Sequence, residues 1–390
     1  MEAERAPLLT AAFARVWFAT FTVFASFGMV VLTVPLYVTD ELNASSIGVG
    51  VAMGAASITS VILAPVSGRI ADRRGRRPVF LVGGIGMVAC YAALAMTPGM
   101  AAVVAIRLVA GAAEATFVVG AYTVVVDIAP ESRRGEALSL VSLGSYLGLT
   151  TGPVAADLIL GGGRFVLVWL VAASLVMTAI ATLATLPETR PQTETAPSAG
   201  WLPPRAALRP GLLVLIAMAG FGGFATFSAL YARELGIGRP GLVFALFGGV
   251  IVLVRAVGRK VPDSLGPQRT LAISFVCLAV GLATIGAWQS PAGLLAGTVV
   301  FATGQALAYP SAVLLAMNAS STEERAAVVG SVGAFVDVAL GLGSFILGAV
   351  ASVTGYAGSF LVASVIALSG LLAVASLRQS GRIPAEEGAP

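Results

Sequence analysis

Long apolar segments alternate with short polar breaks along the whole chain. Each segment is close to the about 20 residues with which an α-helix crosses the hydrocarbon core of a bilayer, and is far longer than a strand. The segments lie near residues 12–36, 45–67, 79–97, 101–126, 137–160, 165–186, 211–232, 241–258, 270–288, 292–317, 327–352 and 357–377. This pattern predicts an all-α integral membrane protein with twelve transmembrane helices.

The composition agrees with that prediction and narrows the chemistry. Of the 390 residues, 57% are hydrophobic and 11% charged, which excludes an ordinary soluble protein. The chain has no histidine and a single lysine, Lys260, so we expect no imidazole metal site, no phosphate-binding P-loop and no cofactor. Cys90 and Cys277 fall inside predicted spans, so no disulfide framework is expected. We predict that the protein is not an enzyme.

The basic residues predict the orientation in the membrane. Arg15 leads directly into a full-length span, so no cleavable signal peptide is expected. If the N-terminus is cytoplasmic, only Arg164, Arg233 and Arg239 fall outside, Arg107 lies within a span, and the other 19 of the 23 basic residues face the cytoplasm. We therefore predict an inner-membrane protein with both termini in the cytoplasm. The net charge of +4 reflects this topology and does not indicate nucleic-acid binding.

The two halves of the chain resemble each other. Asp72 aligns with Asp263, Glu114 with Gln305 and Arg134 with Arg325 without a gap, and the phenylalanines of the first span align with those of the seventh. Because an even number of spans separates equivalent positions, the halves have the same orientation. We predict two pseudo-symmetric six-helix bundles, residues 1–186 and 211–390, joined by a proline-rich cytoplasmic linker at 187–210. The second bundle ends in a short cytoplasmic tail.

One polar break carries five arginines, in the run Gly68-Arg69-Ile70-Ala71-Asp72-Arg73-Arg74-Gly75-Arg76-Arg77. This run resembles the loop 2–3 signature of the major facilitator superfamily of secondary transporters, and Asp127-x-x-Pro130-x-x-x-Arg134 resembles the loop 4–5 pattern of the same family. The resemblance implies a gate on the cytoplasmic side, in which Asp72 caps a helix end and pairs with Arg134. The gate residues implied are Gly68, Asp72, Arg73, Gly75, Arg76, Arg77 and Arg134. The alternative is that the arginines only anchor the topology.

Charged residues inside spans are costly and indicate function or pairing. Arg107, Gly111 and Glu114 share one face of the fourth span, and Glu114 lies near the midplane. The sequence around Arg107 and Gly111 resembles the fourth-helix motif of the family, which is associated with proton transfer in antiporters. Asp337 is the one charge of the eleventh span and could face Glu114 across a central cavity. In a chain without histidine, buried carboxylates are the natural proton carriers. For Asp337, a hydrogen bond at a helix–helix contact is the alternative.

The fifth span carries a ridge of small residues, Gly144-x-x-x-Gly148-x-x-x-Gly152-Pro153. Such a ridge allows a neighbouring helix to approach closely. It resembles the antiporter motif of the family, which favours export.

Aromatic side chains recur on the first helix of each half. Packing or a substrate surface can explain such stripes, and polar amides are scarce in the spans. That scarcity excludes a sugar site, and an anionic phosphate would need opposed arginines, of which the spans offer Arg107. The residues expected to line a substrate cavity are Phe21, Phe24, Phe117, Phe224, Phe227, Gln305 and Tyr309.

Together these features predict a secondary active transporter that works as a monomer in the lipid bilayer. Its expected partners are protons and a hydrophobic or amphiphilic small molecule, exported by alternating access. Two alternatives remain open: an importer or facilitator of a polar metabolite, and a signalling or scaffold membrane protein that does not transport.

Overall fold

The computed structural model describes residues 8–97, 99–161, 163–189, 204–258, 264–321 and 325–380, and within these ranges the chain forms helices and no strand. The first half contains α1 (Ala11–Asp40), α2 (Ser46–Arg74), α3 (Arg76–Leu94), α4 (Met100–Ile128), the short η2 (Glu131–Arg133), α5 (Arg134–Leu160) and α6 (Phe165–Ala184). The second half contains α7 (Arg205–Glu234), α8 (Gly241–Val257), α10 (Pro267–Ala287), α11 (Pro291–Asn318) and α12 (Arg325–Ser380).

Nine helices of the described ranges are long and apolar enough to cross a membrane. The 17-residue α8 is shorter than the others, and α5 also falls outside this group. The long α12 is two helices joined at Gly355, whose φ of 73° and ψ of 177° interrupt the helix. The predicted all-α membrane fold is confirmed, and the count of twelve spans stays a prediction.

Local sequence signals set several helix starts. The side chains of Thr10, Ser45 and Ser290 accept hydrogen bonds from backbone N–H groups in the first turns of α1, α2 and α11, which have no partner within the helix. Pro267 and Pro291 begin α10 and α11, where a missing N–H costs nothing.

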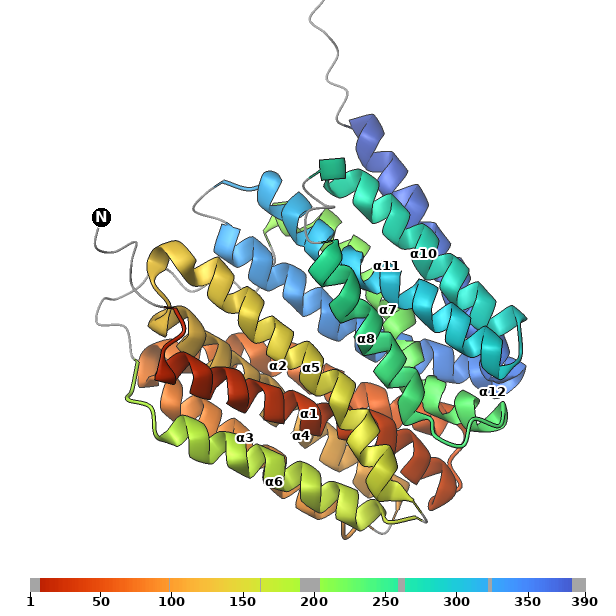
Figure 1. The fold of residues 1–390 in the computed structure, drawn as a ribbon, viewed down its shortest axis with the longest axis horizontal. Helices are drawn as coiled ribbons and strands as arrows, with labels where there is room; N and C mark the ends of the chain where they lie inside the picture. The colour runs from red at the N-terminus through yellow and green to blue at the C-terminus, as the bar shows by residue number, and fades with distance from the viewer. Residues whose placement is uncertain are drawn as a thin grey trace, which may run out of the picture.

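The helices of each half pack mainly on one another. In the first half α1 lies against α5 and α6, α2 against α4, and α3 against α4 and α6; in the second half α7 lies against α12, α10 against α11 and α12, and α8 against α11. Figure 1 shows the red-to-yellow helices gathered at the lower left and the green-to-blue helices at the upper right. The two sets converge toward the lower right of that view and diverge toward the upper left.

Contacts between the halves are made by α2 with α12, α5 with α8, and α1 with α7. We call the end of the bundle that holds residues 68–77 the arginine-rich end, and the opposite end the arginine-poor end. At the arginine-poor end the Arg233 guanidinium lies 2.6 Å from the Asp40 carboxylate. There too, a Cβ added to Gly241 would lie 2.8 Å from the Cβ of Asp157, and one added to Gly50 would strike the carbonyl oxygen of Ser344. The two halves are therefore in close contact at this end.

Two helix ends differ from the predicted limits. The α2 helix continues to Arg74, so most of the predicted loop at 68–77 is helical, because charged residues outside the apolar stretch still form helix. The α7 helix begins at Arg205, inside the range predicted as linker, and takes up Pro210 near its start. Asp157, near the end of α5, is half-buried against Gly241 of α8. Linker residues 190–203 lie outside the described residues, and the domain limits stay predictions.

Candidate functional site

An ion pair lies within the fourth helix. Nη1 of Arg107 is 3.4 Å from Oε1 of Glu114, and Nε of Arg107 donates a 3.4 Å hydrogen bond to the carbonyl oxygen of Ala52 on α2. Arg107 is buried, and a Cβ added to Gly111, between the two charges, would strike the carbonyl oxygen of Ala56 on α2. The close approach of α2 and α4 thus buries Arg107 beside the carboxylate of Glu114, whose side chain is 20% exposed.

A second partly buried carboxylate belongs to the other half. Ser60 on α2 donates a 3.1 Å hydrogen bond to Oδ2 of Asp337 on α12. One turn further along α12, a Cβ on Gly341 would lie 2.9 Å from the Cβ of Ser57. Asp337 therefore sits at a helix–helix contact, as the alternative interpretation proposed. It interacts electrostatically with Glu114, but the two carboxylates bond to different partners.

At the arginine-rich end, Arg76 is the centre of a buried network. Its Nε lies 2.7 Å from Oδ2 of Asp127 at the end of α4, and its Nη1 lies 3.1 Å from Oδ1 of Asp72 and 2.8 Å from the carbonyl oxygen of Ala71. The expected pair of Asp72 with Arg134 is not formed. Arg134 instead lies 3.6 Å from Glu131, because the turn of η2 places these two exposed side chains together.

The helix end beside this network is capped by a residue from the end of the first half. The Glu188 carboxylate accepts hydrogen bonds from the backbone N–H groups of Arg76 at 2.8 Å and Arg77 at 3.2 Å. This is the capping role expected of Asp72, which instead lies in the last turn of α2. Gly75 joins α2 to α3 with a φ of 96°, and a Cβ there would lie 2.7 Å from the Glu188 carboxyl carbon.

We expect Gly75→Ala to lower the free energy of unfolding by about 1–3 kcal/mol, because this combination of φ and ψ is strained for any residue with a Cβ. The measurement is the unfolding temperature in detergent. Gly135→Ala is the matched control, since its new methyl group meets nothing within 4 Å in a regular helix. Equal unfolding temperatures for the two variants would contradict the expectation.

The glycine ridge of α5 lies on α1. A Cβ on Gly144 would lie 3.0 Å from the Trp17 ring, one on Gly148 would lie 2.5 Å from the carbonyl oxygen of Phe21, and one on Gly152 would strike the carbonyl oxygen of Ala25. The added Cβ atoms at the last two positions meet backbone, which cannot move aside as a flexible side chain can. The ridge therefore brings two helix axes together, and Pro153 continues it against Gly28.

Three of the aromatic residues expected in the cavity are fully buried by helix packing. Phe117 packs against Gly84 of α3, and Phe224 lies among three phenylalanines of α8 and α11. The ring of Phe227 stacks on that of Tyr356, with the ring centres 5.7 Å apart. They are core residues because close neighbours surround the faces on which they lie. Gln305 is buried as well, with Nε2 3.8 Å from the sulfur of Met218. The partly exposed members of the set are Phe21, Phe24 and Tyr309.

Sequence reasoning missed several partners. Asp127 was part of a quoted motif but not matched to Arg76, and Glu188 follows Pro187 in a segment assigned to the linker. Arg255 was counted as a topology anchor, yet its Nη2 donates a 2.8 Å hydrogen bond to the hydroxyl of Tyr146 in the other half. A basic residue at the inner end of the shortest span was the available signal.

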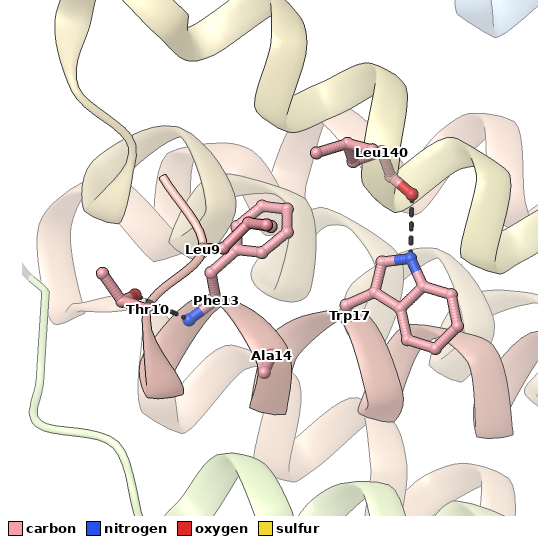
Figure 2. Close-up of a pocket in the computed structure, with 6 residues that line it drawn as sticks. All are labelled: Leu9, Thr10, Phe13, Ala14, Trp17 and Leu140. Atoms are coloured by element: carbon pink, nitrogen blue, oxygen red, sulfur yellow. Dashed lines mark hydrogen bonds between the residues drawn. The ribbon is translucent and has the colours of Figure 1, made fainter. Parts of the chain in front are cut away.

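A pocket of about 270 Å³ opens between α1 and α5 near the arginine-rich end, lined by Leu9, Thr10, Phe13, Ala14, Trp17 and Leu140. Figure 2 shows the Trp17 indole N–H pointing to the carbonyl oxygen of Leu140, at 2.9 Å. None of the buried charges lines this pocket, so it is separate from the Arg107–Glu114 site.

Comparison with known proteins assigns the family. The family model for the Major Facilitator Superfamily matches residues 16–285 and 241–389. An uncharacterized MFS-type transporter of Salmonella typhimurium is 26% identical over 374 residues, covering 92% of this chain and 95% of the relative. The multi-drug resistance efflux pump PmrA of Streptococcus pneumoniae is 28% identical over 278 residues, covering 66% of this chain and 68% of the pump.

Solved structures share the fold. A bacterial homolog of the human lysosomal transporter Spinster, in an inward-facing and unoccupied conformation, superposes with a TM-score of 0.81 at 13% identity, covering 97% of this chain and 99% of that chain. The nucleoside transporter NupG gives a TM-score of 0.77 at 14% identity, covering 95% and 100%. With the family model matching nearly the whole length and the fold shared throughout, this chain belongs to the major facilitator superfamily of membrane transporters.

Proposed function

We propose that this transporter exports a hydrophobic or amphiphilic small molecule in exchange for protons. The observation that carries the proposal is the pair of the buried Arg107 and the partly buried Glu114 on a helix long and apolar enough to cross a membrane. A carboxylate in a span is expensive unless it is paired or protonated, so Glu114 has two tolerated states. Paired with Arg107 it is charged, and released from Arg107 it takes a proton. Substrate binding that favours one of these states would couple the two fluxes.

The arrangement of the halves supports alternating access. Close contacts join them at the arginine-poor end, and the arginine distribution favours a cytoplasmic location for the opposite end. In that orientation the described conformation faces the cytoplasm, where an exporter takes up its substrate. The bacterial Spinster homolog of similar fold was solved in an inward-facing conformation, and the relative PmrA is a multi-drug efflux pump. Both agree with the proposal, and export direction belongs to it.

The test uses proteoliposomes that contain a trapped pH-sensitive dye. A panel of lipophilic cations, organic anions and neutral aromatic drugs is added, and substrate-induced proton movement is followed. We expect at least one compound to move protons in protein-containing liposomes and none to do so in protein-free ones. Substrate flux that is independent of the proton gradient would overturn proton coupling, and folded protein without any flux would favour the scaffold alternative.

The ion pair of Asp40 and Arg233 closes the arginine-poor end and gives a second prediction. An exposed ion pair contributes about 0–1 kcal/mol to the stability of the state in which it forms. Asp40→Arg should therefore raise the fraction of molecules that are open at the arginine-poor end by up to roughly fivefold. The double variant Asp40→Arg/Arg233→Asp should restore it. Spin labels placed at Leu42 and Gly238, in a background without Cys90 and Cys277, would report the distance between α1 and α7.

Arg164→Asp is the control, because this exposed arginine at the same end bonds only to the nearby carbonyl of Gly161 among described partners. It should leave the distance distribution unchanged. If the charge-reversed double variant stays as open as Asp40→Arg, the pair does not hold this end closed.

A further inference from the structure

A second arginine on an apolar helix lies between the two halves, on the face that α8 turns toward α5. The guanidinium carbon of Arg255 is 4.1 Å from the centre of the Tyr146 ring, and Nη2 donates to the Tyr146 hydroxyl. At ~1.5 Å per residue, Arg255 lies about 21 Å along α8 from Gly241, and Tyr146 about 21 Å along α5 from Leu160. Both therefore lie at the same level along their helices, with Arg255 in the last turn of α8.

Arg255 has no carboxylate partner among the ion pairs of the described residues, unlike Arg107 and Arg76. Its Nε is buried and finds no hydrogen-bond acceptor within the same part of the chain. A cation in a span without a counter-ion is costly, and an aromatic ring offsets only part of that cost. The site therefore has a positive charge and at least one donor available for an anion.

Two further tyrosines interact with this pair of Arg255 and Tyr146. Tyr309 on α11 interacts electrostatically with Arg255, Tyr146 and Tyr122, and its hydroxyl lies 3.9 Å from where a Cβ on Gly333 would be. Tyr122 on α4 shares a 2.8 Å hydrogen bond with Ser145. Because Tyr146 accepts its bond from Arg255, its own O–H remains free to donate. Both halves thus contribute donors beside apolar ring faces.

We propose that Arg255, with the hydroxyls of Tyr146 and Tyr309, binds the anionic group of an amphiphilic aromatic organic anion. A guanidinium fork suits a carboxylate or a sulfonate, and the tyrosine rings accept the apolar body of the same molecule. This inference rests on the proposed transport function and names the substrate class for it. The site uses groups from both halves, as a central transport site requires.

The test is equilibrium binding of radiolabelled naphthaleneacetate to the purified full-length protein in detergent. Naphthalenesulfonate, naphthaleneacetamide and naphthylmethylammonium serve as competitors of equal apolar size. We expect the wild type to bind the labelled acid, and the amide and ammonium to compete at least tenfold more weakly than unlabelled acid. If the sulfonate competes as well as the unlabelled acid, the site accepts any organic anion of this size. If the sulfonate competes more weakly, the site prefers a carboxylate. Either result supports the proposed site.

Arg255→Gln should weaken binding of the acid at least tenfold and abolish its advantage over the amide, while Arg255→Lys should keep part of that advantage. Arg209→Gln is the control, since it removes the same charge from an exposed position on α7. The proposal is overturned if the wild type does not bind the acid at millimolar concentration, if the amide competes equally, or if Arg255→Gln binds like the wild type.

Binding needs no proton gradient, so its outcome is separate from the test of proton coupling. If Arg255 only holds α5 against α8 through Tyr146, Arg255→Gln should lower the unfolding temperature and leave any preference for the acid intact. That result would assign the arginine to packing.

Discussion

Glu114→Gln abolishes substrate-driven proton movement, a loss of roughly a hundredfold or more, because it removes the group that we propose binds the proton. Glutamine has nearly the same shape, and its carbonyl oxygen can still accept a hydrogen bond from Arg107. The variant should therefore fold. What it cannot do is alternate between a charged, paired state and a protonated, unpaired one.

A substrate-exchange assay distinguishes a loss of proton coupling from a failure to fold. This exchange needs no net proton transfer, so Glu114→Gln should retain it while losing proton movement. Trapped-dye fluorescence and counterflow of a labelled substrate in the same proteoliposomes measure the two activities. Glu136→Gln is the matched control: Glu136 is exposed at the start of α5, where its carboxylate bonds to Arg133 at 2.8 Å.

Asp337→Asn should have the milder effect. Asparagine can still accept a hydrogen bond from Ser60, so only the difference between a charged and a neutral acceptor is lost, about 1–1.5 kcal/mol or roughly a five- to tenfold change in rate. If Asp337→Asn abolishes proton movement and Glu114→Gln does not, the proton site lies on α12. If both variants move protons like the wild type, neither carboxylate carries the proton.

The span positions could be predicted from the sequence because the bilayer imposes a simple length requirement on each helix. The predicted segment at 241–258 matches α8 at Gly241–Val257, and that at 165–186 matches α6 at Phe165–Ala184. Helix ends that extend beyond the apolar stretch, such as the end of α2, were harder to predict. Hydropathy indicates which residues lie in the membrane, but a helix can continue beyond them. That Arg107 and Glu114 share one helix face followed from helix periodicity, and their ion pair is compatible with that placement.

Partners that come from distant segments could not be predicted in this way. Arg76 is one of five arginines in residues 68–77, and only the fold brings Asp127 and Glu188 to it. The phenylalanine stripe of α7 shows the same limit. Periodicity indicates that Phe224 and Phe227 share a face, but the rings of α8, α11 and α12 that cover this face are set by the packing of the second half.

Gly148→Leu should prevent the protein from folding. The first added carbon would already lie 2.5 Å from the carbonyl oxygen of Phe21 and 2.7 Å from the amide nitrogen of Ala25. Because both are backbone atoms of α1, relief requires the two helices to separate. The smaller change, Gly148→Ala, should cost about 1–3 kcal/mol of unfolding free energy, as other overpacked cores do.

Yield of monodisperse protein after detergent extraction checks the leucine variant, and the unfolding temperature checks the alanine variant. Gly249→Leu and Gly249→Ala are the matched controls, since this glycine also lies mid-helix in a span but has nothing within 4 Å of its added Cβ. They should behave like the wild type. Wild-type yield and unfolding temperature for Gly148→Leu would show that α1 and α5 do not pack in this way in the membrane.

The expected severity follows from where α5 sits. Its glycine ridge rests on α1, while Tyr146 and Thr150 meet Arg255 and Gly248 of α8 in the other half. Helices in a membrane gain no hydrophobic energy by associating, so close contact along small residues supplies much of their attraction. A side chain that moves α5 away from α1 therefore also shifts the surface on which the second half rests. In the alternating access that we propose, the bundles move against each other, and a ridge that keeps α5 fixed within its own bundle would let this movement act as a rigid-body step.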